Sequence, residues 1–262
     1  MSNAIVETNY GKVEGQQNRN SFVWRGIPYA QPPLGDLRFR PPHRPDSWDG
    51  VKDATQFQPV APQSTKDLDR KIGRGAYTIS EDCLYLNIWS PGADKKRRPV
   101  MVWIHGGSFT RGTGMLPIYD GTSFCEKGDI VLVTINYRLG VLGFLHLEEF
   151  GGKDYATSGN CGILDQVAAL QWVQENIEHF GGDPNRVTIF GQSAGAGSVG
   201  TLLSVPSAKG LFQQAILQSG ALEYIHQLEI AKINAQKVID SLNLGSDVLS
   251  KLKEMPATEL VQ

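Results

Sequence analysis

Apolar runs and helical stretches alternate through the middle of the chain. Residues 98–107 (RPVMVWIHGG) and 129–137 (DIVLVTINY) are apolar along most of their length and are bounded by polar turns, which is typical of strands buried on both faces of a sheet. Between 162 and 181 the apolar residues recur every three or four positions, which predicts an amphipathic helix. Three further segments continue the alternation as strand, helix and strand: 186–191, 193–204 and 215–220.

This alternation predicts an α/β fold with a mostly parallel central sheet and helices on both faces. The flanking segments have other patterns. Residues 1–60 predict short strands, turns and a proline-rich surface loop, and the polar, irregular residues 61–82 predict a long loop. Residues 228–262 have a helical pattern without a closing strand or cap. We therefore expect residues 1–262 to form part of a single α/β domain that is incomplete at its C-terminal end.

Composition narrows the class of protein without identifying it. Of the 262 residues, 40% are hydrophobic and 20% are charged, as in ordinary soluble globular proteins. A formal net charge of −2 gives no electrostatic reason to expect nucleic acid or an anionic membrane as partner. No secretory signal is visible at the N-terminus, and the apolar runs are too short to span a bilayer. We expect neither a nucleic-acid partner nor a membrane partner.

The cysteines bear on the cellular compartment. Cys83, Cys125 and Cys161 are widely spaced and odd in number. Such spacing argues against a disulfide framework and against a metal site of the CxxC type. A reducing, cytoplasmic setting and no bound metal are therefore expected.

Two motifs overlap in residues 186–200 (RVTIFGQSAGAGSVG). Residues 191–195 match the nucleophile elbow G-x-S-x-G, and residues 195–200 match the dinucleotide loop G-x-G-x-x-G. The elbow needs a strand, a tight turn and a helix, and the surrounding pattern supplies that order. The dinucleotide loop needs its first glycine at the end of the strand and an acidic residue about twenty positions later. Gly195 lies beyond the strand, and Gln218 and Ser219 occupy the place of the acid, so the elbow is favoured.

A second feature supports a nucleophilic role for Ser193. His105, Gly106 and Gly107 directly follow a predicted buried strand. Adjacent glycines leave backbone N–H groups free to stabilise the oxyanion of an acyl-transfer reaction, and Ala194 would add a third N–H group. Each motif alone also has a simpler interpretation as a glycine-rich turn without chemistry. Together, in the expected order, they favour acyl transfer.

These motifs belong to a longer resemblance. The sequence resembles the type B carboxylesterases, the family of para-nitrobenzyl esterases and cholinesterases. The resemblance implies an α/β-hydrolase fold and hydrolysis of a small-molecule carboxylic ester through an acyl-enzyme on Ser193. It also implies an oxyanion hole formed by the N–H groups of Gly106, Gly107 and Ala194, with no cofactor. The matching stretches keep the order and spacing of the family: 22–42, 80–91, 99–109, 119–124, 133–145, 159–199 and 210–220.

The sequence departs from the family pattern in three respects, of which the first two are local. Gln192 precedes the nucleophile where the family often has glutamate, which removes a charge close to Ser193. Many secreted members pair the cysteine equivalent to Cys83 with one upstream, but residues 58–63 (QPVAPQ) contain no cysteine. Cys83 is therefore expected to be a free, buried thiol.

The catalytic base is the third and most consequential departure. The resemblance implies a triad of serine, then glutamate or aspartate, then histidine, with both later members beyond residue 262. A serine hydroxyl needs such a base to become an effective nucleophile. None of the five histidines matches the family's base, and we expect each to be structural or solvated: His43, His105, His146, His179 and His226.

The chain is thus interpreted as the N-terminal half of a serine carboxylesterase. The triad acid and histidine are expected on a missing C-terminal half, either in cis or as a separate chain. Without that half, an apolar sheet edge would be exposed and would favour association. Two alternatives stay open, namely a non-catalytic binding or adhesion-type member of the fold and an inert fragment. Retention of Ser193 with both glycines favours the enzyme.

Two further groups of residues have predicted roles. Ion pairs that fix loops are expected to involve Arg138, Glu81, Asp82 and Asp165. Aromatic residues near the oxyanion loop are expected either to line a substrate pocket or to belong to the core: Trp103, Phe109, Tyr119 and Phe124.

Overall fold

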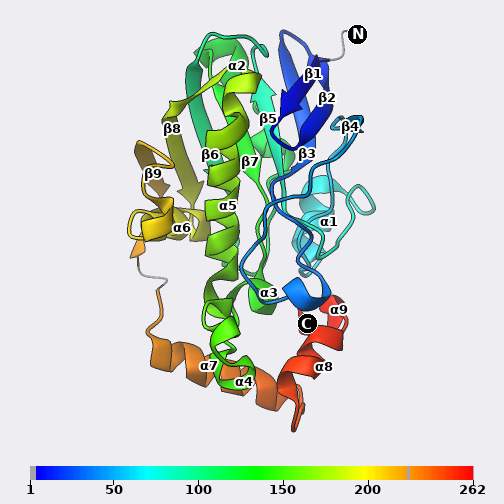
Figure 1. Cartoon of the computed structure of the whole chain (residues 1–262), viewed down its shortest axis with the longest axis vertical. Coiled ribbons are helices and arrows are strands. Elements are labelled where there is room, and N and C mark those ends of the chain that lie inside the picture. The colour runs from blue at the N-terminus through cyan, green and yellow to red at the C-terminus, as the bar shows by residue number, and fades with distance from the viewer. Residues whose placement is uncertain (1–3, 223–224, 262) are drawn as a thin grey trace.

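A nine-stranded sheet forms the centre of the computed structural model, which describes residues 4–222 and 225–261 (Figure 1). Its spatial order is β1-β2-β3-β5-β7-β6-β8-β9, and β4 pairs with β2 beside this path. The strands are β1 (Ala4–Thr8), β2 (Gly11–Asn18), β3 (Ser21–Pro28), β4 (Val51–Asp53), β5 (Tyr85–Ser90), β6 (Arg98–Ile104), β7 (Val131–Ile135), β8 (Gly182–Gln192) and β9 (Gln214–Gln218).

The sheet is parallel in its second half and antiparallel in its first. Strands β7, β6, β8 and β9 run parallel, as the alternation of strands and helices predicts. Strands β1, β2, β3, β5 and β7 are joined by antiparallel pairs. The N-terminal strands therefore make the whole sheet mixed: short turns enforce the antiparallel pairs β1–β2 and β2–β3, whereas β4 pairs with β2 in parallel.

Helices cover the sheet unequally. The α-helices are α1 (Lys66–Ile72), α2 (Thr122–Gly128), α3 (Gly140–Phe144), α4 (Glu148–Gly151), α5 (Cys161–Asn176), α6 (Ala194–Leu202), α7 (Leu228–Ser241), α8 (Val248–Glu254) and α9 (Ala257–Leu260). On one face, Val102 and Ile189 share the main core with Leu170 of α5 and Val199 of α6. On the other face, Trp103 belongs to a smaller cluster whose helical contribution comes from α2. Helices thus lie on both faces, as predicted, but the second face is thinly covered.

The helix expected between 162 and 181 is present as α5, followed by a 3₁₀ turn (Ile177–Phe180). Its apolar positions are buried, and so are polar residues on its other sides, among them Asp165 and Gln166. The helix is therefore enclosed on most of its circumference, because Asp165 pairs with Arg138 and Gln166 bonds Ser198 of α6 in addition to the contacts of the apolar face. A periodic pattern shows only where apolar residues lie and misses this second layer of packing.

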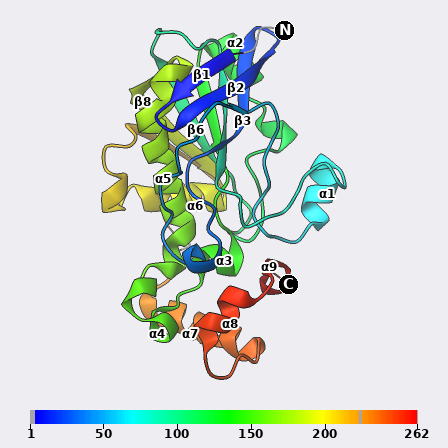
Figure 2. The ribbon, with the colours of Figure 1, turned by 45° about the vertical axis from the view of Figure 1, so that its right-hand side comes forward.

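Two segments outside the central alternation complete the fold. The predicted loop 61–82 contains a short helix, α1, so the prediction of continuous irregular structure there was wrong. The helical pattern at the C-terminal end is confirmed as α7, α8 and α9, which lie together beyond one end of the sheet (Figures 1 and 2). These helices form a second core with Leu142, Leu145 and Tyr155.

Candidate active site

Ser193 lies at the edge of the sheet where the parallel strands end. The carboxyl ends of β6, β8 and β9 are in register, with Ile104 beside Gly191 and Gln192 beside Gln218. The segment after β6 contains Gly106, and the residue after β8 is Ser193. Ligands of open parallel sheets bind at this edge, because side chains from several strands meet there.

The backbone of Ser193 has the strained geometry of a nucleophile elbow. Its φ is 56° and its ψ is −123°, a region that costs a non-glycine residue about 1–3 kcal/mol. The strain is held by hydrogen bonds from the Ser193 N–H to the Gln218 carbonyl (2.9 Å) and from the Gly197 N–H to the Ser193 carbonyl (2.9 Å). The half-buried side chain has no hydrogen-bond partner within residues 4–222 and 225–261. The hydroxyl is therefore available to a substrate and to an external base.

Close packing explains why glycine flanks the nucleophile. A Cβ atom at Gly195 would overlap the carbonyl oxygen of Ile104, and one at Gly191 would lie 2.7 Å from that same oxygen. The end of β6 thus presses directly on the turn that carries Ser193. Because these contacts involve backbone rather than flexible side chains, no larger residue fits without moving the elbow.

The glycine loop after β6 lies against the nucleophile. A Cβ atom at Gly106 would be 3.3 Å from the Cβ of Ser193 and would collide with the Gln192 carbonyl. Gly107 adopts a φ of 126°, which favours glycine. In the described part of the chain, the N–H groups of Gly106, Gly107 and Ala194 donate no hydrogen bond. Three backbone donors near one serine are what an oxyanion hole requires.

Neighbouring side chains hold this loop in place. The His105 ring stacks on Tyr137 with centroids 4.4 Å apart, and its Nδ1 donates to the Gly106 carbonyl (2.9 Å). The Tyr137 hydroxyl donates to the His105 carbonyl (2.7 Å), and the Gln63 amide bonds both backbone groups of Gly112. Burial lowers the pKa of His105 to about 4. His105 is therefore neutral near pH 7 and positions the loop.

The dinucleotide interpretation of the overlapping motif does not fit the geometry. Its three glycines, Gly195, Gly197 and Gly200, all lie inside helix α6 and are buried. The turn at the end of the strand is made by Ser193 instead. A phosphate-binding loop needs its first glycine in that turn, with backbone N–H groups open to the ligand. The nucleophile elbow is the interpretation that this geometry supports.

The remaining histidines are remote from the elbow or solvated. His179 precedes β8, which starts beside Arg98 and ends beside Ile104, so the length of β6, roughly 20 Å, separates it from Ser193. His146 is buried between α3 and α4, with Nε2 3.9 Å from Glu148. His43 and His226 are exposed. None of them forms a hydrogen bond with Ser193 in the described residues, so no base is assigned within the chain.

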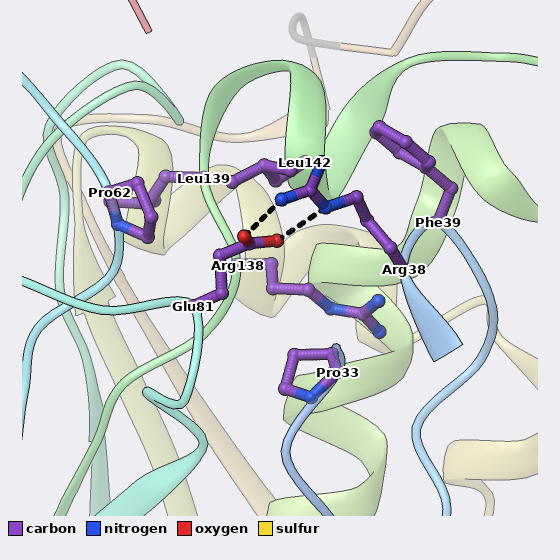
Figure 3. A pocket seen from close by; sticks show the side chains of 8 residues that line it. All are labelled: Pro33, Arg38, Phe39, Pro62, Glu81, Arg138, Leu139 and Leu142. Carbon is purple, nitrogen blue, oxygen red and sulfur yellow. Dashed lines mark hydrogen bonds and ion pairs between the residues drawn. The ribbon is translucent and has the colours of Figure 1, made fainter. Parts of the chain in front are cut away.

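The predicted ion pairs are largely present, with one partner that sequence reasoning missed. Arg138 and Asp165 form a buried bidentate pair with N–O distances of 2.6 and 2.8 Å. Glu81 pairs with Arg38, and Figure 3 shows these two groups facing one another beside Arg138. The small cavity at this pair, about 10 Å³, holds at most a single water molecule. No ion pair of Asp82 occurs in the described ranges; its backbone N–H donates to the Ser80 hydroxyl (3.1 Å).

Arg38 also fixes the C-terminal helices. Its Nη1 donates to the carbonyls of Leu252 (2.7 Å), Lys253 (3.0 Å) and Met255 (2.7 Å), where α8 ends. A guanidinium at a helix C-terminus satisfies carbonyls that have no partner within the helix. The proline-rich loop and α8 are more than 200 residues apart, so no local sequence signal could reveal this contact.

A cavity of about 590 Å³ opens next to the elbow. Trp103 and Tyr119 line it, whereas Phe109 packs on Phe144 and Phe124 is partly exposed beside Phe190. Of the four predicted aromatic residues, two thus line the cavity and two pack against other aromatic side chains. The cavity lining, which includes two glutamines that sequence reasoning did not connect, is Lys71, Trp103, Leu116, Pro117, Ile118, Tyr119, Gln192 and Gln218.

Clusters of metal ligands, membrane-spanning helices and disulfides are absent from the part of the chain that the structure describes. No group of three or more histidine, cysteine, aspartate or glutamate residues could hold a metal ion there. No helix there is long and apolar enough to cross a bilayer. Cys83, Cys125 and Cys161 are all buried and free, which confirms the expectation for Cys83.

The chain is similar to esterases along its whole length. A model of the carboxylesterase family matches residues 2–262. The para-nitrobenzyl esterase of Bacillus subtilis (strain 168) is 46% identical over 266 residues, covering 100% of this chain and 53% of the relative. The fumonisin B1 esterase of Sphingopyxis macrogoltabida is 46% identical over 260 residues, covering 98% of this chain and 46% of the relative.

Solved structures of carboxylesterases are also similar to this chain. The crystal structure of the Geobacillus stearothermophilus carboxylesterase EST55 at pH 6.2 has a TM-score of 0.92 and 52% identity, covering 98% of this chain and 52% of that one. The similarity supports the α/β-hydrolase fold predicted from the sequence. This chain spans about half of the length of these relatives.

Proposed function

The chain belongs to the carboxylesterase family, and we propose that it is the nucleophile-bearing half of a serine carboxylesterase. The observation that carries the proposal is the geometry around Ser193. The serine sits in a strained turn, its hydroxyl is unpaired in the described residues, and a glycine loop with free N–H groups lies against it. This combination supports acyl transfer because it offers a nucleophile and oxyanion donors at one point.

The reaction follows from these groups. The Ser193 oxygen adds to the ester carbonyl carbon while a base accepts the hydroxyl proton. The carbonyl oxygen becomes an oxyanion, which the N–H groups of Gly106, Gly107 and Ala194 stabilise. Collapse of this intermediate expels the alcohol, which leaves with the proton from the base. Water then adds to the acyl-enzyme by the reverse sequence and releases the carboxylic acid.

The base and its orienting carboxylate come from polypeptide beyond residue 262. Two observations support this part of the proposal. No histidine in the described residues hydrogen-bonds to Ser193, and the relatives are about twice as long as the matched region. The missing half is supplied in cis or as a separate chain. A serine without this half keeps its binding geometry but lacks general-base catalysis, which contributes typically 10²–10⁴-fold.

The substrate class is a small-molecule carboxylic ester. The relatives are named as esterases of para-nitrobenzyl compounds and fumonisin B1, which supports this class without selecting a substrate. The adjoining cavity offers the aromatic surfaces of Trp103 and Tyr119 for an apolar part of the ester. The three free thiols support a reducing, cytoplasmic location.

Active-site labelling tests the proposal. This chain is co-expressed with the part of the EST55 carboxylesterase that it does not match, and the product is treated with a fluorophosphonate probe. Peptide mass spectrometry is expected to place the adduct on Ser193. Ser193→Ala should abolish labelling, whereas Ser204→Ala, an exposed serine after α6, should retain it. Labelling that survives in Ser193→Ala would assign the chemistry to another residue.

A further inference from the structure

The cavity beside the elbow has a positively charged residue in its lining and no acidic one. Among the described residues that line it, Lys71 is the only one that carries a charge, and the others are glutamines and apolar or aromatic residues. Binding surfaces are complementary in charge to their ligands. A cavity with an ammonium group and no carboxylate therefore favours a ligand that carries a negative charge.

Helix α1 brings Lys71 to this cavity. Figure 2 shows the helix on a loop that projects from the side of the sheet. Lys71 and Ile72 follow Leu68 by three and four positions, so these three side chains lie on one face of the helix. Leu68 is buried in a cluster with Leu116, and Ile72 packs against that cluster. The packing that anchors α1 therefore turns Lys71 toward the wall of the cavity, which residues 116–119 form.

The charge of Lys71 is not neutralised by its own helix. Its ammonium group has no ion-pair partner within the described residues. The two acidic residues of α1 have other partners. Asp67 pairs with Arg111 (3.1 Å). Asp69 accepts a hydrogen bond from the Tyr77 hydroxyl (2.6 Å). The ammonium of Lys71 is therefore available to a ligand in the cavity.

Two glutamine side chains add hydrogen-bond donors to the same cavity. Gln192 and Gln218 are register neighbours at the ends of β8 and β9, so their side chains lie on the same face of the sheet. Phe190 precedes Gln192 by two positions and pairs in register with Trp103, so the aromatic wall of the cavity lies on that face too. Neither glutamine side chain forms a hydrogen bond within the described residues. Both amides can therefore donate to a ligand.

We propose that Lys71 is a specificity-determining residue that makes the cavity select esters bearing a carboxylate. The ammonium group binds the carboxylate, and the amides of Gln192 and Gln218 donate further hydrogen bonds to it. The aromatic wall takes the apolar part of the same molecule. The carboxylate belongs either to the acyl part or to the alcohol part of the ester. This inference rests on the proposed function, in which Ser193 attacks the ester carbonyl next to the cavity.

Binding of matched anionic and neutral esters tests the inference without catalysis. The chain is used as Ser193→Ala, so that no ester is turned over, and is titrated by calorimetry at low ionic strength. Monophenyl succinate, with its carboxylate on the acyl part, is compared with its neutral amide, phenyl succinamate. 4-Acetoxybenzoate, with its carboxylate on the alcohol part, is compared with 4-acetoxybenzamide. In at least one pair the anionic ester is expected to bind about fivefold more tightly, and added salt should reduce this preference.

Substitutions in the lining assign the preference to Lys71. Lys71→Met keeps a long side chain without the charge and should remove the preference, whereas Lys71→Arg should retain it. Lys66→Met is the matched control, because Lys66 is exposed on the same helix but does not line the cavity, and it should also retain the preference. Gln192→Glu adds a carboxylate of similar size to the lining and should weaken binding of the anionic ester. Circular dichroism verifies that each variant is folded.

The other outcomes would overturn the inference. Equal affinity within both pairs would do so, as would the absence of binding by all four esters. A preference that survives Lys71→Met, or that Lys66→Met removes to the same extent, would assign the effect to the general charge of the surface.

The proposed function has a separate readout in the labelling of Ser193. A preference that depends on Lys71, without labelling of Ser193, would establish the carboxylate site and refute the esterase function. Labelling of Ser193 without any charge preference would support the esterase function and overturn the role of Lys71.

Discussion

The two edges of the sheet are finished in different ways. At one edge, β1 alternates buried residues such as Val6 with exposed ones such as Glu7, and Glu7 lies opposite Lys12 of β2. At the other edge, β9 has no charge and leaves Ile216 and Leu217 exposed. Charged, alternating residues protect an edge from further pairing, whereas a neutral apolar strand invites it. Within the described residues, β1 is thus the protected edge of the sheet and β9 the unprotected one.

The same contrast runs through the active site. The contacts that hold the elbow in shape come from this chain. The end of β6 packs against Gly195, the glycine loop packs against Ser193, and the buried His105 stacks beside that loop. In the part of the chain that the structure describes, no acidic or basic side chain forms a hydrogen bond with the Ser193 hydroxyl. Within the described residues this chain supplies the backbone geometry of the elbow, whereas the proposed function assigns proton transfer to the missing half.

Breaking the buried ion pair between Arg138 and Asp165 should have the largest effect on the free energy of unfolding. Arg138→Ala would leave the fully buried Asp165 carboxylate unpaired, which costs about 3–5 kcal/mol of unfolding free energy. Urea denaturation measures this loss. Arg44→Ala is the control, because the Arg44 guanidinium is 73% exposed and its pair with Glu175 contributes under about 1 kcal/mol. An Arg138→Ala protein as stable as the parent would show that the pair does not hold the loops.

The second-largest loss of stability is expected from truncating a buried side chain in the main core. Ile27 of β3 is completely buried in the main core. Ile27→Ala should lower the free energy of unfolding by about 2–5 kcal/mol through lost apolar contact and the cavity left behind. Equilibrium denaturation of the isolated chain gives the value. A loss below about 1 kcal/mol would mean that the main core around Ile27 is not closely packed.

Lowering the pH should decrease the free energy of unfolding because of His105. The pKa of this ring is about 4 in the folded chain, against an ordinary value of 6.5. The unfolded chain therefore binds a proton below pH 6.5 that the folded chain does not accept until about pH 4. Each pH unit of separation corresponds to about 1.4 kcal/mol, so His105 should cost about 3 kcal/mol of stability as the pH falls through this window.

The measurement is the free energy of unfolding from pH 7 to 4, for the parent and for His105→Gln. The variant loses the stacking on Tyr137 and should be less stable at pH 7, but its stability should depend less on pH. Equal pH profiles for the two proteins would show that His105 is not buried in its neutral form.

Local sequence signals were sufficient for the elbow and insufficient for its surroundings. The strand–turn–helix order around Ser193 and the pair Gly106–Gly107 depend on a few neighbouring residues, so the sequence alone predicts them. Arg38 could not be matched to Glu81 or to the end of α8, because those contacts join segments far apart in the chain. The glutamines of the cavity, Gln192 and Gln218, become neighbours only through the register of β8 and β9.

The mixed sheet shows the same limit. The apolar runs of β6, β7 and β8 predict parallel strands because helices separate them in sequence. The N-terminal strands have weak alternation, and their antiparallel pairing with one another and with β5 is seen only in the structure. The short helix α1 inside the predicted loop 61–82 was missed because its pattern is polar on most sides. Periodicity predicts where a residue is buried, and tertiary partners decide which neighbours it has.

The smallest effect in the isolated chain is expected at the open edge. Ile216→Ala should change its free energy of unfolding by less than about 1 kcal/mol, because Ile216 is 43% exposed and loses little contact on truncation. In the complex with the missing half, the same substitution should cost about 2 kcal/mol or more, as at a buried isoleucine. Denaturation of the chain with and without its partner measures the difference, and Ile27→Ala should cost the same in both samples. A large cost for Ile216→Ala in the isolated chain would show that β9 is already covered, and the contrast between the two edges would disappear.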